Sequence, residues 1–448
     1  MDRRDALVEK FMQNVRDRNA GQDEFLQAVE EVAADVLTVE KAHSGYADAR
    51  VLERLTEPDR LIQFRVVWED DDGAVQINRG WRVQMSNAIG PYKGGLRFHP
   101  TVTPSVLKFL AFEQIFKNAL TGLPLGGAKG GSDFDPSGRS EAEVMRFCQA
   151  FMAELAPHIG PDVDVPAGDI NVGTREIGWL FGAYKRQKGL FHGALTGKGP
   201  AFGGSILRTE ATGYGLVYFV DCMLNAAGES IEGKRIVISG KGNVSTHAAE
   251  KAIDQGGIVV TLSDTSGTLY APDGFSRAAV AWVEERKAAG EDIASPPSEF
   301  GLEWKDGALP WGTEANIALP CATQNEMDAD AAKAVTDSGV TLLAEGANMP
   351  LTSDAIAVLD RAGIVQAPGK AANAGGVAVS GLEMSQNAQG RFMTAEQVDE
   401  ALRNIMRDIH DTVADEADTE GTSPDYRRGA NVAGYRHVAR AVCSYGIV

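Results

Sequence analysis

The sequence has few basic residues for its length. Its 448 residues include 43 Lys and Arg against 62 Asp and Glu, which gives a formal net charge of −19 at pH 7. No block of Lys or Arg stands out within this acidic chain, so a surface that binds nucleic acid or another polyanion is not expected. The expected partners are small molecules.

Cysteine is scarce as well. The four cysteines are scattered, and neither they nor the seven histidines have the spacing of metal ligands. We therefore expect no metal site, and the cytoplasm is the default compartment. Long apolar runs are also absent: no stretch of 18 apolar residues occurs, and the N-terminus lacks the pattern of a signal peptide. No membrane span is expected.

What is present is material for more than one core. The chain is about three times as long as a typical domain, and 44% of its residues are hydrophobic. We therefore expect two or three domains. The first part of the chain predicts a hairpin with strands at 61–68 and 74–78, and a buried helix at 103–120 that has apolar side chains on almost every side.

After about residue 200, short β-rich runs alternate with helical patterns. This alternation is typical of βαβ units and a parallel sheet. Near the end of the chain, Thr394 and Gln397 form a capping box that predicts the start of a helix. The predicted strands are 236–239, 257–262, 317–320, 341–344 and 364–367.

A glycine-rich turn follows the first of these strands. Gly240 and Gly242 open a G-x-G-x-x-S pattern with Ser245 at the third glycine position, and Asp264 ends the next strand. Glycines let the backbone approach a pyrophosphate at a helix N-terminus, so this context predicts a dinucleotide-binding turn. A tight strand-to-helix turn without a ligand is the alternative.

Three lysines have unusual surroundings. Gln114 and Lys117 are three residues apart on the apolar helix and share a face. Lys93 lies in P-Y-K-G-G, and Lys129 has glycines on both sides. A solvated surface charge is the ordinary interpretation of any single lysine. Clustered, partly buried ammonium groups instead lower one another's pKa, and such a lysine can act as a general acid or base.

Two further segments contain candidate site residues. Asp169 ends D-V-P-A-G-D, which is equally compatible with a carboxylate that stabilises its own turn and with one that moves protons beside the lysines. Residues 346–348 and 368–380 are rich in small side chains and follow predicted strands. This favours a ligand-lining crevice, with a plain loop as the alternative.

In their order along the chain, these motifs resemble those of the small hexameric glutamate dehydrogenases of bacteria and lower eukaryotes. The similarity covers the whole chain. It rests on PYKGGLRFHP at 91–100, the helix at 109–120, LPLGGAKGGSDFDP at 123–136, DVPAGD at 164–169, RTEATGYG at 208–215, ALPCATQN at 318–325, AEGANMP at 344–350 and the segment 367–384.

The resemblance implies how a substrate would be bound. Lys93 and Ser380 would bind the distal carboxylate of glutamate or 2-oxoglutarate. Gln114, Lys117 and the backbone of Gly168 would bind the α-carboxylate. These implied roles make chemical sense, because a dicarboxylate needs cationic or hydroxyl donors at both of its ends.

The resemblance also implies the catalytic and cofactor residues. Lys129 would be the catalytic lysine, and Asp169 would transfer protons while ammonia adds and water leaves. The residues that would bind the dinucleotide or line its crevice are Thr212, Gly240, Gly242, Asn243, Asn348 and Asn373.

The implied architecture is α/β, with two domains and a cleft between them. Residues 1–202 together with 424–448 would form an α/β substrate-binding and oligomerisation domain, and 203–423 a doubly wound Rossmann-type nucleotide domain. The active site would lie in the cleft, and its closure would exclude water. The assembly would be a homohexamer of two stacked trimers.

The choice of cofactor depends on the turn at Asp264. A carboxylate there favours NAD, because it accepts hydrogen bonds from the ribose and repels a 2′-phosphate. The turn S-D-T-S-G nevertheless resembles that of NADP-linked members: Thr265 and Ser266 can donate to a phosphate, and Lys287 could offset the charge of Asp264. A second basic residue that some members have after that lysine is absent, with Ile293 near its position. We expect NADP, with NAD as the alternative.

Two other functions are open at this stage. A related dehydrogenase for leucine, valine or phenylalanine would not need a charged group for the distal end of its substrate, whereas Lys93 and Ser380 supply donors there. A dinucleotide sensor without turnover would not need Lys129 and Asp169. The expected function is therefore the reversible, NADP-linked oxidative deamination of L-glutamate to 2-oxoglutarate and ammonia.

Overall fold

The computed structural model describes residues 3–417 and 424–447, and the chain divides into two compact units. Unit 1 comprises Met1–Ile206, Val379–Val398 and Asn431–Val448, and unit 2 comprises Leu207–Ala378 and Asp399–Ala430. Each unit has its own sheet and its own hydrophobic core. A search of the described helices for one that is long and apolar enough to span a bilayer found none.

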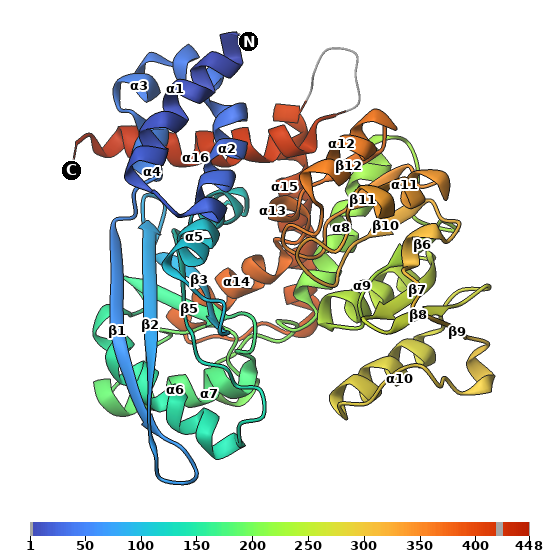
Figure 1. The fold of residues 1–448 in the computed structure, drawn as a ribbon, viewed down its shortest axis with the longest axis horizontal. Helices are drawn as coiled ribbons and strands as arrows, with labels where there is room; N and C mark the ends of the chain where they lie inside the picture. Colours follow the sequence, from blue (N-terminus) through green and yellow to red (C-terminus); the bar gives the residue numbers. More distant parts are fainter. Residues whose placement is uncertain (1–2, 418–423, 448) are drawn as a thin grey trace. The chain divides into compact units, whose positions relative to one another are not determined.

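Unit 1 is built on a mixed sheet of five strands. The strands are β1 (Arg60–Glu69), β2 (Val75–Ser86), β3 (Tyr92–Phe98), β4 (Gly127–Ser132) and β5 (Asp164–Gly168). Their order is β1-β2-β4-β3-β5, with β3 parallel to both β4 and β5. The predicted hairpin is confirmed as β1 and β2, two strands longer than the other three (Figure 1).

The glycine-rich motifs around Lys93 and Lys129 form the strands β3 and β4, which the sequence did not predict. Only glycine fits where these strands approach one another: a Cβ on Gly94 would lie 1.6 Å from the carbonyl oxygen of Ala128, and one on Gly95 would lie 2.8 Å from the Cβ of Asp169. Pro166 is tolerated because β5 is an edge strand. The interpretation of D-V-P-A-G-D, residues 164–169, as a turn is therefore wrong for residues 164–168, which form β5.

The helices of unit 1 lie before β1, between its later strands and after β5, and two more come from the end of the chain. They are α1 (Arg3–Arg18), α2 (Asp23–Ala42), α3 (Ser44–Asp48), α4 (Val51–Leu55), α5 (Pro104–Leu120), α6 (Glu141–Leu155) and α7 (Thr174–Lys188), with the later residues of α14 (Gly375–Gln389) and of α16 (Tyr426–Tyr445). Short 3₁₀ turns occupy Ala156–His158 and Pro200–Phe202.

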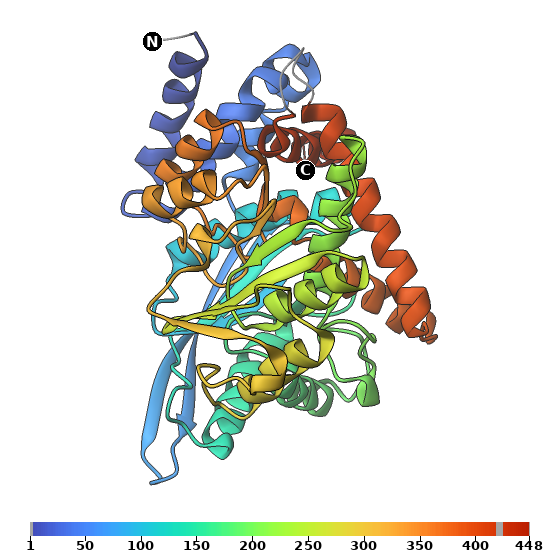
Figure 2. The same cartoon turned by 90° about the vertical axis from the view of Figure 1, so that its right-hand side faces the viewer.

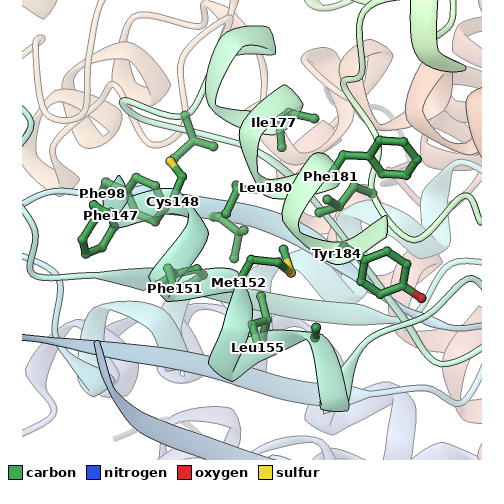
Figure 3. Close-up of a cluster of buried hydrophobic side chains, with 14 of the residues drawn as sticks. Phe98, Phe147, Cys148, Phe151, Met152, Leu155, Ile177, Leu180, Phe181 and Tyr184 are labelled. Atoms are coloured by element: carbon green, nitrogen blue, oxygen red, sulfur yellow. The ribbon is translucent and has the colours of Figure 1, made fainter. Parts of the chain in front are cut away.

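The two faces of this sheet are covered differently. On one face, Leu96 and Phe98 of β3 pack with the apolar sides of α6 and α7 in a large core cluster (Figure 3). On the other face, α5 approaches so closely that a Cβ on Gly127 would lie 2.6 Å from a side-chain carbon of Ile115. Helix α5 is buried along most of its length, as its apolar sequence predicts, and begins at the N-cap Thr103.

Unit 2 contains a seven-stranded sheet in the order β12-β11-β10-β6-β7-β8-β9. The strands are β6 (Arg235–Ile238), β7 (Ile258–Asp264), β8 (Gly267–Tyr270), β9 (Glu303–Asp306), β10 (Ile317–Leu319), β11 (Leu342–Ala344) and β12 (Val365–Ala367). The five predicted strands are confirmed as a parallel set. Strands β8 and β9 were not predicted, and both pair antiparallel at one edge.

The helices of unit 2 alternate with these strands, as in a doubly wound fold. They are α8 (Ala211–Ala226), α9 (Asn243–Asp254), α10 (Arg277–Ala288), α11 (Ala329–Asp337), α12 (Ser353–Arg361), α13 (Gly369–Ala372), most of α15 (Ala395–Ala417) and the first residues of α14 and α16, with 3₁₀ turns at Ser298–Phe300 and Pro310–Gly312. Helix α15 follows the predicted capping box of Thr394 and Gln397. It lies alongside α8, where the Tyr218 hydroxyl donates to Asp399 (Figure 2).

Candidate functional site

Charged side chains converge on the face of the unit 1 sheet that α5 covers. Lys93 and Arg97 lie on the same face of β3, because side chains alternate along a strand. The parallel register of β3 with β4 places Lys129 on this face as well. Asp169 directly follows β5, and its carboxylate contacts both Arg97 and Lys129.

The carboxylate of Asp169 is held between two cations. Its Oδ1 lies 3.0 Å from the Lys129 ammonium, and its Oδ2 accepts a hydrogen bond of 2.8 Å from Nε of Arg97. The side chain of Asp169 is 15% exposed, that of Lys129 5% and that of Arg97 13%. Water therefore screens these two ion pairs only weakly. The carboxylate of Asp169 binds Arg97 and Lys129 and does not stabilise its own turn. The interpretation of Asp169 as a turn-stabilising residue is therefore wrong.

Burial lowers the pKa of Lys129; the charge of Asp169 opposes that shift, and the positive charges of Arg97 and Arg82 add to it. The predicted direction is confirmed, but the like charges come from arginines. Burial alone would raise the pKa of Asp169, yet the charges of Lys129 and Arg97 outweigh it and hold the pKa of that carboxyl below its usual range. Asp169 is therefore ionised at neutral pH.

A second buried ion pair lies beside the first. Arg82 of β2 binds Asp164 of β5 through two hydrogen bonds of 2.9 and 2.5 Å and donates to the carbonyl of Gly94 at 3.0 Å. Both charged side chains are fully buried. The sequence analysis missed Arg82 and Arg97. The available signal for Arg82 was an arginine inside the apolar run from Trp81 to Met85. No sequence signal marked Arg97.

Lys93 is also buried, at 2% exposure. Its ammonium donates a hydrogen bond of 2.8 Å to the hydroxyl of Thr196, another residue that the sequence analysis missed. Ser380, on α14 within the same unit, is 2% exposed. Gln114 and Lys117 are among the few residues of α5 that are only partly buried, and the Gln114 amide donates to Asn118 at 2.6 Å.

The segments that carry Thr196 and Ser380 are joined by a buried ion pair. Glu383, three residues after Ser380, lies 2.7 Å from the ammonium of Lys198 and accepts a hydrogen bond of 3.0 Å from the N–H of Gly197. The two charged side chains are 0% and 1% exposed. Gly168 lies close by at the end of β5: the backbone N–H of Thr196 donates to the carbonyl of Pro166 at 3.0 Å, and a Cβ on Gly197 would lie 3.9 Å from the backbone nitrogen of Gly168.

In unit 2, the predicted dinucleotide turn has the local geometry that a phosphate needs. Gly240 has a φ of +85°, and a Cβ there would lie 2.5 Å from the Ser245 hydroxyl. Ser245 is fully buried and donates to the carbonyl of Ser239 at 2.8 Å. A Cβ on Gly242 would meet nothing within 4 Å, so the space before the N-terminus of α9 is open to a ligand.

Other predicted residues lie at the carboxyl ends of β11 and β12. The amide of Asn373, which is 3% exposed, donates to Asn348 and to the carbonyls of residues 346 and 347, each at 3.1 Å. A Cβ on Gly376 would lie 2.5 Å from the hydroxyl of Thr212, so the start of α8 packs tightly against the start of α14. The stretch 369–380 is mostly helical, and the interpretation as a plain loop is wrong.

At the end of β7, Asp264 is paired with a residue that the sequence analysis did not single out. Its Oδ2 lies 2.8 Å from the ammonium of Lys241, and its Oδ1 accepts hydrogen bonds from the N–H and hydroxyl of Ser266. Lys287 instead donates a hydrogen bond of 2.5 Å to the side chain of Asn243. The expectation that Lys287 offsets Asp264 therefore needs correction, because the direct partner is Lys241.

One group of described side chains has the spacing of metal ligands, although no sequence motif marked it. His247 and Glu250 of α9 and Glu284 of α10 have potential ligand atoms within 4.8 Å of one another. Arg277 already pairs with Glu250 at 2.8 Å. The group therefore has an ordinary explanation as a cluster of ion pairs.

Comparison with known families agrees with this geometry. The model of the Glutamate/Leucine/Phenylalanine/Valine dehydrogenase family matches residues 203–446, and that of the Glu/Leu/Phe/Val dehydrogenase dimerisation domain matches residues 58–186. The chain belongs to this dehydrogenase family. The two matches together include most of the residues described above, from Lys93 to Asn373.

Individual members of the dehydrogenase family are similar over the full length of the chain. An NADP-specific glutamate dehydrogenase from Psychrobacter sp. is 54% identical, over 98% of this chain and 99% of that protein. An NAD-specific glutamate dehydrogenase from Bacteroides fragilis is 51% identical, over 98% and 100%. The crystal structure of Plasmodium falciparum glutamate dehydrogenase has a TM-score of 0.95 at 46% identity, covering 99% of this chain and 96% of that one.

Proposed function

We propose that this dehydrogenase catalyses the reversible oxidative deamination of L-glutamate to 2-oxoglutarate and ammonia, with NADP as the cofactor. The observation that carries the proposal is the buried ammonium of Lys93 on the same sheet face as the Lys129–Asp169 pair. A buried cation is costly unless an anion binds it, so it suits a substrate with a second carboxylate. A leucine, valine or phenylalanine side chain has no group that could accept a hydrogen bond from the Lys93 ammonium.

We assign the substrate contacts as follows. Lys93 and Ser380 bind the distal carboxylate, with Thr196 orienting the Lys93 ammonium. Gln114, Lys117 and the backbone of Gly168 bind the α-carboxylate. Donors at both ends hold a dicarboxylate in one orientation and so fix its Cα relative to Lys129.

The chemistry at Cα needs a group that moves protons. Asp169, ionised and held by Arg97, can accept a proton from the substrate amine, and Lys129, with its lowered pKa, can pass a proton to and from the water that replaces the amine. The nicotinamide, when bound, supplies hydride transfer at Cα. Burial of Lys129 and Asp169 keeps bulk water from exchanging these protons freely.

The residues of unit 2 fit a dinucleotide. The positive φ of Gly240 and the open space at Gly242 leave room for the pyrophosphate at the N-terminus of α9, where Asn243 is the first helical residue. Thr212, Asn348 and Asn373 would line the rest of the site. At the adenosine ribose, Thr265 and Ser266 are exposed. The Thr265 hydroxyl can donate to a 2′-phosphate, and the Ser266 hydroxyl could do so by leaving its present acceptor, Asp264.

We further propose which part of the chain binds which ligand, which oligomer the chain forms and in which compartment it acts. Residues 1–202 with 424–448 would bind substrate and form the oligomer, and 203–423 would bind the dinucleotide. The hairpin of β1 and β2 supports a homohexamer: β1 is an edge strand, and paired residues Val67 and Ile77 are 46% and 68% exposed. The four cysteines, all free, are in keeping with a cytoplasmic enzyme.

An absorbance assay of the purified chain tests the proposed activity. With 2-oxoglutarate, ammonium and NADPH, the reduced cofactor should be consumed, and the rate should depend on all three. The 2-oxo acids of leucine and phenylalanine serve as substrate controls and should react at least about 100-fold less efficiently. Equal efficiency with these monocarboxylic acids would contradict the proposed substrate, and more efficient use of NADH than NADPH would contradict the proposed cofactor.

A further inference from the structure

Asp264 has an unfavourable charge for a turn that receives a phosphate. It lies at the end of β7, where a carboxylate accepts hydrogen bonds from ribose hydroxyls and repels a 2′-phosphate. In this chain both of its oxygens are already occupied. Ser266 donates to Oδ1 from its N–H at 2.8 Å and from its hydroxyl at 2.6 Å, and the ammonium of Lys241 lies 2.8 Å from Oδ2.

The partner lysine comes from the glycine-rich turn itself. Lys241 stands between Gly240 and Gly242, and its side chain is 24% exposed, so a ligand can reach the ammonium. The same ammonium lies 3.4 Å from the backbone carbonyl of Glu291, in the segment after α10. Ile293 in that segment is fully buried and carries no charge. Lys241 therefore places a positive charge between Asp264 and the segment after α10.

Lys287 occupies a different place in the same region. It donates to the side chain of Asn243 at the N-terminus of α9, 2.5 Å away. Lys241 is the cation in direct contact with Asp264, whereas the charge of Glu284 acts on Lys287. Without Lys241, the carboxylate of Asp264 would face a phosphate ester of charge about −1.5 to −2 without a cation on it.

We propose that Lys241 cancels the charge of Asp264 and thereby allows this turn to accept the 2′-phosphate of NADP. The inference rests on the proposed cofactor and adds the residue that determines its selection. Lys241 acts on Asp264 through a direct ion pair, so its effect on binding depends on the presence of that carboxylate.

Calorimetric titration with two nucleotide probes tests this role without turnover. Adenosine 2′,5′-bisphosphate carries the 2′-phosphate, and 5′-AMP does not. Lys241→Gln should weaken binding of the bisphosphate by about 10- to 100-fold and change 5′-AMP by less than about 3-fold. Adding Asp264→Asn should restore most of the lost affinity, because no carboxylate is then left to repel the phosphate. In the absorbance assay, the preference for NADPH over NADH should fall in Lys241→Gln and recover in the double variant.

The control and the contradicting outcomes separate this inference from the proposed cofactor. Lys234→Gln removes a lysine just before β6, where it pairs with Glu229, and should leave both affinities unchanged. Equal weakening of both probes by Lys241→Gln, no weakening, or no recovery in the double variant would overturn the inference alone. A wild-type chain that binds 5′-AMP as tightly as the bisphosphate would overturn the proposed cofactor and this inference together.

Discussion

At the scale of single residues, substrate choice depends on which group of the substrate faces the buried ammonium of Lys93. Lys93→Leu combined with Ser380→Val should lower kcat/KM for 2-oxoglutarate by at least about 100-fold, because a buried carboxylate would lose its donors. The 2-oxo acid of leucine should lose much less, or gain. Steady-state kinetics with both acids measures the ratio, and Lys185→Leu, at an exposed position of α7, is the control. An unchanged preference would remove both residues from the distal site.

Arg97 sets the protonation of the two proton-transfer groups. Its positive charge lowers the pKa of Lys129 and of Asp169. Arg97→Gln removes that charge, so both pKa values rise, and every limb of the pH–rate profile that either group sets should move to higher pH. Profiles of kcat/KM for wild type and variant measure the shift. Arg175→Gln, an exposed arginine of α7, should not move the profile, and a downward shift for Arg97→Gln would contradict the assignment.

At the scale of elements, the ion pair of Lys198 and Glu383 fastens α14 to the loop that carries Thr196. Both charges are almost fully buried, so Glu383→Ala would leave Lys198 unpaired and should cost about 3–5 kcal/mol of stability. Lys198→Met with Glu383→Leu should recover most of this loss, because neither charge is then buried. Urea unfolding measures both. Glu9→Ala breaks an exposed pair of α1 and should change the midpoint little, and an equally small change for Glu383→Ala would disprove the role.

At the scale of the whole molecule, the acidic chain should still assemble, because the proposed interface is apolar. Light scattering at micromolar concentration should give six times the 47.7 kDa chain mass. Val67→Glu with Ile77→Glu puts charges on the exposed face of the hairpin and should reduce that mass. Leu309→Glu, at an apolar position of unit 2 that is 66% exposed, should leave it unchanged. A monomeric wild type would contradict the proposed hexamer.

The sequence by itself determined the features that depend on local spacing. The apolar helix at 103–120, the hairpin, the five parallel strands of unit 2 and the turn at Gly240 were all predicted within a few residues of their observed positions. Each follows from a pattern shorter than one element: hydrophobic periodicity, a turn residue that needs positive φ, or a cap. The motifs around Lys93, Lys129 and Asp169 were located from sequence in the same way.

Only the tertiary structure decided which charges meet and which backbones touch. Arg97 with Asp169, Lys198 with Glu383, and Lys241 with Asp264 are each more than 20 residues apart, and no local pattern marks their partners. Strands β3, β4 and β5 were missed for a related reason. Their glycines have no side chains to show periodicity, and they form a sheet because neighbouring strands approach too closely for any Cβ, a contact that exists only after the chain has folded.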